Sequence, residues 1–317
     1  MEKVSEATQG SRITVQAESL VVGYRELIAL RAKEIEFSGN VIAIVGHNGA
    51  GKSTLMKLIL DLLPPREGNI TISENRAQAS KILRPDRHMA FCPEEGAVFA
   101  DITVESYIKL WCRVKQQSPN YYKKAGSRYI ELLNLSPLLG RLGRELSKGQ
   151  RRRVQTAIGF LAEPRLFLVD EPFDGLDVQK TSELAEIVER ESEHMSFLIS
   201  SHRMDVVERI ADTVVVLQHG RFVAHGSVDE VCKKLCPTSV LVEYVEDPHA
   251  TAQHIRDTFQ GCLVTTIGSS LRILGNGYSE ADLARLLSQH GIPSTLYHHS
   301  TADLVDAMNF HLRDISK

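Results

Sequence analysis

The sequence predicts an α/β protein with two domains, a large α/β domain that contains a helical insertion and a small α+β domain that follows it. Short apolar strands at residues 41–45, 166–169, 197–199 and 214–217 alternate with helical segments, which is typical of an α/β domain with buried strands. At 317 residues the chain is long enough for two hydrophobic cores. We therefore expect the main domain to cover residues 12–235.

The helical insertion is expected at about residues 98–150 of the main domain. The strand pattern fades there, and apolar residues recur at helical spacing, with Ile108 and Trp111 in one stretch and Ile130 and Leu133 in the next. This pattern predicts a helical subdomain inserted between two strands of the α/β domain.

The second domain is expected over residues 237–317. Its predicted elements are a strand at 239–245, a helix at 250–259, strands at 263–267 and 271–274, a helix at 280–290 and a strand near 295–297. This βαββαβ order indicates a small ferredoxin-like domain. The apolar stripe of one last helix would consist of Leu304, Val305, Met308 and Leu312.

The composition argues against several classes of protein. A net charge of −3 is unlike that of most nucleic-acid binders, and we expect no nucleic-acid partner. No apolar run approaches the roughly 20 residues that span a bilayer, so a membrane role would need a separate partner. The polar first residues do not resemble a signal peptide. The five cysteines lack paired CxxC spacing, which favours reduced thiols in the cytoplasm over a structural zinc site.

A glycine-rich segment, GHNGAGKST at residues 46–54, directly follows the apolar strand VIAIV. It matches the phosphate-loop pattern GxxxxGK[ST], whose glycines let backbone N–H groups surround phosphate oxygens at a helix N-terminus. Lys52 is expected to reach the β- and γ-phosphates, and the Ser53 hydroxyl to ligate Mg²⁺. The binding residues predicted in this loop are Gly46, Asn48, Gly49, Gly51, Lys52, Ser53 and Thr54.

Two adjacent acidic residues follow a second apolar strand, in LFLVDEP at residues 166–172. Ligands of open α/β sheets bind beyond the carboxyl ends of the strands, where these side chains are expected. Asp170 would hold Mg²⁺ through water. Glu171 would orient the attacking water and accept its proton.

The segment LSKGQ at residues 146–150 is close to LSGGQ, the signature of the ABC ATPase family. Because RRRVQTA and then LFLVDEP follow it, the chain resembles that family. The resemblance implies an ABC-type P-loop NTPase fold with a helical subdomain. It also implies that Ser147, Gly149 and Gln150 bind ATP held by another copy. Lys148 departs from the commoner glycine and leaves Ser147 and Gly149 intact.

The resemblance extends to three further positions. Tyr24 looks like the aromatic residue that stacks on adenine, although core packing is an alternative for a lone tyrosine. Asp177 ends DGLD, which resembles the loop that crosses between partners. His202, in LISSHRMD, looks like the switch histidine that contacts the γ-phosphate.

One position departs from the family pattern. Where the family usually has glutamine, this chain has FCPEEGAVFADITV, which places Glu94 in that role as a catalytic residue and Mg²⁺ ligand. Glu95 is next to Glu94, so either residue could align with that glutamine. An intact Glu171 and His202 still favour hydrolysis.

The resemblance implies a head-to-tail homodimer that sandwiches ATP and Mg²⁺ between two cassettes. It further implies a separate transmembrane permease, with the chain at the cytoplasmic face of the membrane, and it favours an export-type transporter. We expect residues 97–103 to contact that permease. Two alternatives stay open: a soluble ATPase for assembly or remodelling, and an ATP-gated interaction module that does not hydrolyse ATP.

Overall fold

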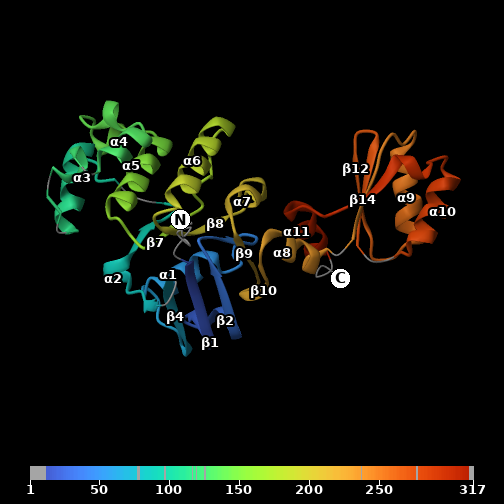
Figure 1. The fold of residues 1–317 in the computed structure, drawn as a ribbon, viewed down its shortest axis with the longest axis horizontal. Helices are drawn as coiled ribbons and strands as arrows, with labels where there is room; N and C mark the ends of the chain where they lie inside the picture. Colours follow the sequence, from blue (N-terminus) through green and yellow to red (C-terminus); the bar gives the residue numbers. More distant parts are fainter. Residues whose placement is uncertain are drawn as a thin grey trace, which may run out of the picture. The chain divides into compact units, whose positions relative to one another are not determined.

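The computed structural model describes residues 12–76, 79–95, 98–115, 117–118, 120–124, 126–236, 238–275 and 278–313. The chain divides into two compact units between His225 and Gly226, and Figure 1 shows the elements of each. Within the described ranges, no helix has both the length and the apolar character needed to cross a membrane. The five cysteines are buried, and none of them forms a disulfide in the part of the chain that the structure describes.

The first unit is built on a ten-stranded sheet in the order β5-β4-β1-β2-β10-β9-β3-β8-β7-β6. Its strands are β1 (Arg12–Tyr24), β2 (Leu27–Gly39), β3 (Val41–Val45), β4 (Glu67–Arg76), β5 (Ala79–Ile82), β6 (Met89–Cys92), β7 (Leu166–Asp170), β8 (Ser196–Ser201), β9 (Thr213–Gln218) and β10 (Arg221–Gly226). Strands β6, β7, β8, β3 and β9 form a parallel region. The four strands predicted from the sequence are all in this region.

The parallel strands are apolar throughout because both faces of the sheet are covered. Alternate residues of β7 enter two different cores. Phe167 and Val169 pack with the helical insertion on one face, and Leu166 and Leu168 pack with α1 and the antiparallel strands on the other. Every residue of β3 and β7 is buried, so neither strand has a solvent face.

An antiparallel sheet region extends beyond the parallel strands and was not predicted from the sequence. Strands β1 and β2 pair from Ile13 opposite Gly39 to Tyr24 opposite Leu27, with an irregularity after Val22. β4 pairs with the other edge of β1, and β5 pairs with β4. This region carries Tyr24 to the end of β1.

Seven α-helices are described in the first unit. They are α1 (Lys52–Ile59), α2 (Pro85–His88), α3 (Val104–Val114), α4 (Ser127–Leu132), α5 (Lys148–Leu161), α6 (Val178–Glu191) and α7 (Met204–Ile210). Helices α3 and α4 lie within the predicted insertion, and both contact α5 (Figure 1). Helix α5 begins at the end of the insertion and continues 11 residues beyond residue 150, back to the sheet.

The second unit contains a four-stranded antiparallel sheet in the order β12-β13-β11-β14. Its elements are α8 (Val228–Leu235), β11 (Ser239–Val242), α9 (Pro248–Thr258), β12 (Leu263–Ile267), β13 (Ser270–Leu274), α10 (Glu280–Gln289), β14 (Tyr297–Ser300) and α11 (Leu304–Arg313). Side chains of α9 and α10, among them Ile255 and Leu287, form one core with the sheet. The last strand lies slightly later than predicted because a 3₁₀ turn occupies residues 294–296.

Two details differ from the sequence analysis. The division at Gly226 places α8 with the second unit, since α8 packs against α11, whereas the sequence analysis placed it in the main domain. The stripe predicted for the last helix was wrong at Val305, which is 45% exposed. Ala307 is buried instead, together with Leu304 and Met308, because it lies three residues after Leu304 on the same helix face.

Close packing between α5 and β7 depends on Gly159. A β-carbon at this position would lie 2.1 Å from the ring of Phe167, which is fully buried between Phe160 and Phe197. We expect Gly159→Ala to lower the free energy of unfolding by about 1–3 kcal/mol through overpacking. Chemical denaturation measures this change. Gly140→Ala is the control, because a β-carbon at Gly140 meets no atom within 4 Å, and equal stability of the two variants would contradict the prediction.

Candidate active site

A cavity of about 840 Å³ lies where the parallel strands end. In register, Val45 of β3 is opposite Ser201 of β8, and Asp170 of β7 is opposite Ser200, so the segments that follow these strands meet at one sheet edge. The predicted site residues that line the cavity are Tyr24, Asn48, Gly49, Gly51, Lys52, Ser53, Thr54, Glu94, Asp170, Glu171 and His202.

The loop between β3 and α1 requires glycine at two close approaches. A β-carbon on Gly46 would lie 2.2 Å from the carbonyl oxygen of Leu217. Gly51 has a φ of 108°, and its β-carbon would lie 2.7 Å from the side chain of Leu30. The loop therefore wraps tightly before α1 begins at Lys52, and the N-terminus of that helix faces the cavity with free N–H groups suited to an anion.

Lys52 is buried and has two partners at the base of the cavity. Its ammonium donates to the carbonyl oxygen of Gly46 at 2.8 Å and lies 3.3 Å from Oε1 of Glu171. Burying a lysine is costly unless its charge is paired, and these contacts provide the pairing. Phosphate oxygens are acceptors of the same kind, so this ammonium is suited to hold them.

Glu171 has an unusual backbone conformation for a buried acidic residue. Its φ is 46°, in the left-handed region, which costs a non-glycine residue about 1–3 kcal/mol. Its backbone N–H donates to Oγ of Ser200 at 2.9 Å, and its Oε2 accepts from the backbone N–H of His202 at 3.2 Å. Nδ1 of His202 is 2.9 Å from the same oxygen. Contacts from α1 and from the end of β8 thus fix the carboxylate.

Asp170 is buried beside Ser200, whose hydroxyl donates to its carboxylate. Ser200 thereby bonds to both acidic residues after β7. Ser200 was not predicted from the sequence, although a signal was present, because it lies near the end of β8 two residues before His202. Two parallel neighbouring strands bring it opposite Asp170.

The cavity offers oxygen ligands that suit Mg²⁺. The Ser53 hydroxyl and the carboxylates of Asp170 and Glu94 line it, and Mg²⁺ is usually held by one or two carboxylates together with substrate phosphates. Among the described residues, no group of three or more His, Cys, Asp or Glu could hold a metal by itself. The donor set therefore fits a magnesium ion that arrives with a phosphate ligand. Glu95 does not appear among the described lining residues.

Five predicted site residues lie outside the described lining of the cavity. One is Gly46, whose carbonyl oxygen accepts from Lys52, and the other four are Ser147, Gly149, Gln150 and Asp177. Ser147 begins α5, where its hydroxyl accepts from the N–H of Gln150 at 3.2 Å and its own N–H donates to Oε1 of Gln150 at 3.0 Å. Gly149 follows in the first turn with open space around it. Asp177 begins α6, and the N–H of Lys180, 2.9 Å away, lowers the pKa of its carboxyl. Ser147 and Asp177 are exposed, and Gly149 and Gln150 are half-buried.

Further lining residues were missed because only the tertiary structure brings them together. His219, in the turn between β9 and β10, lies with its ring 4.8 Å from that of His47 in the glycine-rich loop. Leu27 and Ile28 give the cavity an apolar rim beside Tyr24, which is 40% exposed. That rim is suited to the flat face of a base.

Comparisons with known proteins agree with this geometry. A family model described as ABC transporter matches residues 35–174. The ATP-binding cassette sub-family A member 2 of Rattus norvegicus is 29% identical over 193 residues, which are 60% of this chain and 8% of that protein. The molybdenum import ATP-binding protein ModC of Brucella melitensis is 32% identical over 201 residues, which are 61% of this chain and 55% of that protein.

A solved structure, the ATP-binding subunit of an ABC transporter, superimposes with a TM-score of 0.60 and 30% identity. It matches 69% of this chain and 92% of its own length. The present chain thus spans nearly all of that subunit but only a small part of the rat relative.

The contacts of Lys52 lead to a prediction about nucleotide affinity. Lys52→Ala removes a buried cation that can make charge-assisted hydrogen bonds to phosphate, so we expect ATP affinity to fall by a factor of about 10 to 10³. Titration with a fluorescent ATP analogue measures the dissociation constant. Lys109→Ala on α3 is the control, because Lys109 pairs with Glu105 away from the cavity. Normal affinity of the Lys52 variant would contradict the assignment of the loop.

Proposed function

This chain belongs to the ABC transporter family of ATP-binding subunits, and we propose that it hydrolyses ATP with Mg²⁺ between two copies of itself to drive a separate membrane subunit. The observation that carries the proposal is the Glu171 carboxylate, held between Lys52 and His202 at the end of β7. A carboxylate beside a phosphate-binding ammonium is placed to act on a water that attacks the γ-phosphate.

Each residue of the cavity has a defined role in this proposal. Lys52 and the loop N–H groups hold the phosphates, and Tyr24 stacks on adenine. Glu171 orients the attacking water and accepts its proton, while His202 contacts both the γ-phosphate and Glu171. Ser53, Asp170 and Glu94 hold Mg²⁺, which neutralises charge on the phosphate oxygens when bound. Glu94 also helps to place the water.

A second copy would complete each site. Ser147, Gly149, Gln150 and Asp177 lie outside the described lining of their own chain's cavity, and Ser147 is exposed at the start of a 14-residue helix. Helix N-termini favour anions, so this end of α5 is suited to the phosphates bound by another cassette. A head-to-tail homodimer with two-fold symmetry would then contain two such sites, with ATP between the subunits.

Replacing the carboxylate tests the proposal. We expect Glu171→Gln to bind ATP but to hydrolyse it roughly 10²- to 10⁴-fold more slowly, because an amide cannot accept the proton. Phosphate release measures turnover, and light scattering should detect a dimer that persists with ATP. Glu183→Gln, an exposed change on α6 where Glu183 accepts a hydrogen bond from Gln179, should leave both properties unchanged. Undiminished turnover in Glu171→Gln would remove Glu171 from this role.

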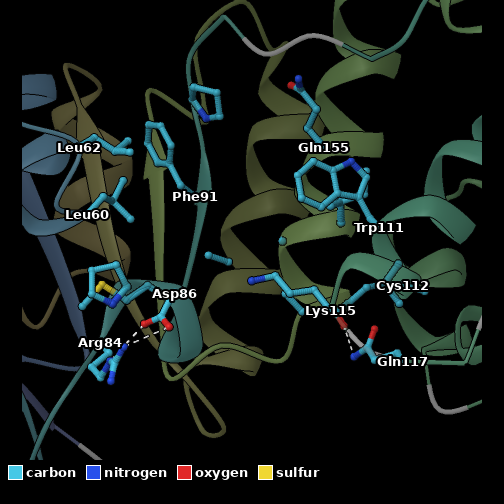
Figure 2. A pocket seen from close by; sticks show the side chains of 18 of the residues that line it. Leu60, Leu62, Arg84, Asp86, Phe91, Trp111, Cys112, Lys115, Gln117 and Gln155 are labelled. Atoms are coloured by element: carbon cyan, nitrogen blue, oxygen red, sulfur yellow. Dashed lines mark hydrogen bonds and ion pairs between the residues drawn. The ribbon is translucent and has the colours of Figure 1, made fainter.

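A second cavity, of about 900 Å³, supports a protein partner. Figure 2 shows Leu60, Leu62 and Phe91 on one side of it and Trp111 and Gln155 on the other, with Lys115 pointing into the space between. The walls are mostly apolar. We propose that it receives an amphipathic cytoplasmic helix of the membrane subunit, whose apolar face would pack on Trp111 and Phe91 and which would carry an acidic residue for Lys115.

The segment predicted to contact the permease, residues 97–103, lies beside this cavity. Ala97 is outside the described residues. Phe99 is 54% exposed and packs edge-on against Tyr107, a residue of the cavity wall, with the two ring centroids 5.3 Å apart. Its exposure and position support a continuous docking surface from Phe99 to the second cavity.

Membrane binding tests this surface. We expect Trp111→Glu to abolish binding to urea-washed membranes of the source cells, because a carboxylate would be buried in the apolar interface, while ATP binding persists. Co-sedimentation measures binding. Val114→Glu is the control, because Val114 is 59% exposed on the same helix and does not line the cavity. Absence of wild-type binding, or binding that survives protease treatment of the membranes, would contradict the proposal. The first result would favour a soluble ATPase.

The direction of transport and the class of the second unit are further parts of the proposal. We propose export because a cassette with a small C-terminal unit resembles export-type subunits, whereas the similarity to an import protein covers 61% of this chain. In cells with Lys52→Ala, the cargo of an exporter should then accumulate inside.

The order β12-β13-β11-β14 supports a ferredoxin-like class for the second unit.

A further inference from the structure

Three consecutive arginines in α5 bind three different parts of the first unit. Nε of Arg151 donates to the carbonyl oxygen of Leu146 at 3.1 Å. Arg153 donates to the carbonyls of Leu133 and Asn134 at 3.3 and 3.5 Å, at the end of α4. Successive residues of a helix point about 100° apart, so each guanidinium reaches a separate neighbour. Arg152, between them, is directed at the candidate active site.

Arg152 joins the two segments that carry the acidic residues of the site. Its Nη1 donates to the carbonyl of Pro93 and, at 3.0 Å, to that of Glu94, and its Nη2 donates to the carbonyl of Asp170. Cys92, the last residue of β6, is opposite Val169 of β7, so Pro93 and Asp170, the next residue of each segment, lie at the same level. One guanidinium therefore bridges two neighbouring strand ends where they enter the cavity.

All of these acceptors are backbone carbonyls, so Arg152 holds the main chain in place. The planar guanidinium can donate to several carbonyls at once, whereas a lysine ammonium on a flexible stem cannot hold the same geometry. Because Arg152 holds the backbone at Glu94 and Asp170, it fixes the position from which each carboxylate side chain extends. Partners of metal-binding residues often govern metal affinity in this way.

We propose that Arg152 is a positioning residue that sets Mg²⁺ affinity and links it to the start of α5. The inference rests on the proposed function. Arg152 is five residues after Ser147 in the same helix, and a helix moves largely as a rigid rod. When a nucleotide of the partner copy contacts the helix start, any rotation of α5 moves the carbonyls of Glu94 and Asp170. Occupation of one site thus adjusts metal binding in the other.

Metal binding without turnover tests the proposal. Mn²⁺ binding to the ATP complex is measured by electron paramagnetic resonance in full-length chains that carry Glu171→Gln, with Arg152→Lys or Arg153→Lys added. We expect Arg152→Lys to weaken Mn²⁺ binding roughly tenfold, while ATP affinity without metal is unchanged. Arg153→Lys is the matched control, because it alters the same kind of contact one residue along the helix and should leave Mn²⁺ affinity unchanged.

The outcomes separate this inference from the proposed function. Unchanged Mn²⁺ affinity in Arg152→Lys, or an equal loss in Arg153→Lys, would overturn the role of Arg152. If Arg152→Lys unfolds at the assay temperature, Arg152→Gln is measured instead, because its amide still donates to one carbonyl. Unfolding of both variants would assign Arg152 to folding and also overturn the proposal. Failure of the proposed function would appear separately, as normal ATP turnover in Glu171→Gln alone.

Discussion

The ion pair between Lys52 and Glu171 is the contact on which the site depends. It joins the glycine-rich loop to the end of β7 across the strand between them, and both side chains are buried. Glu171 adopts a left-handed backbone conformation that an acidic side chain rarely takes. Lys52, His202 and Ser200 together offset that cost, so the strained residue is held from both sides. The carboxylate is therefore preorganised beside a buried ammonium that is suited to hold phosphate.

This preorganisation is possible because the strands around it are buried on both faces. Residues of β7 alternate between two cores, which leaves the strand no freedom to shift along its neighbours. In-register pairing with β8 then places Ser200 next to Asp170, and pairing with β6 places Pro93 beside the same residue. A rigid sheet thus ends in short polar segments, and chemistry is confined to those segments.

Helix α5 links the parts of the first unit that the proposal assigns to different tasks. Ser147 at its start is exposed, Arg152 in its first half binds the backbone beside two acidic residues, and Gly159 near its end packs on Phe167. The second cavity also borders this helix through Gln155. In the proposed function, the signature, the metal-binding segment and the partner surface share this one helix, which would give a physical route from nucleotide binding to the membrane subunit.

The sequence by itself determined what lies within contiguous motifs: the parallel strands, the glycine loop, the acidic pair, the signature and the order of elements in the second unit. Each depends on local spacing and strand burial, which a linear pattern records. Only the tertiary structure decided the pairing of β1 with β2, the contacts of Ser200 and His219, and the place of α8. Those features join segments that are distant in the chain, and tertiary packing decides which segments meet.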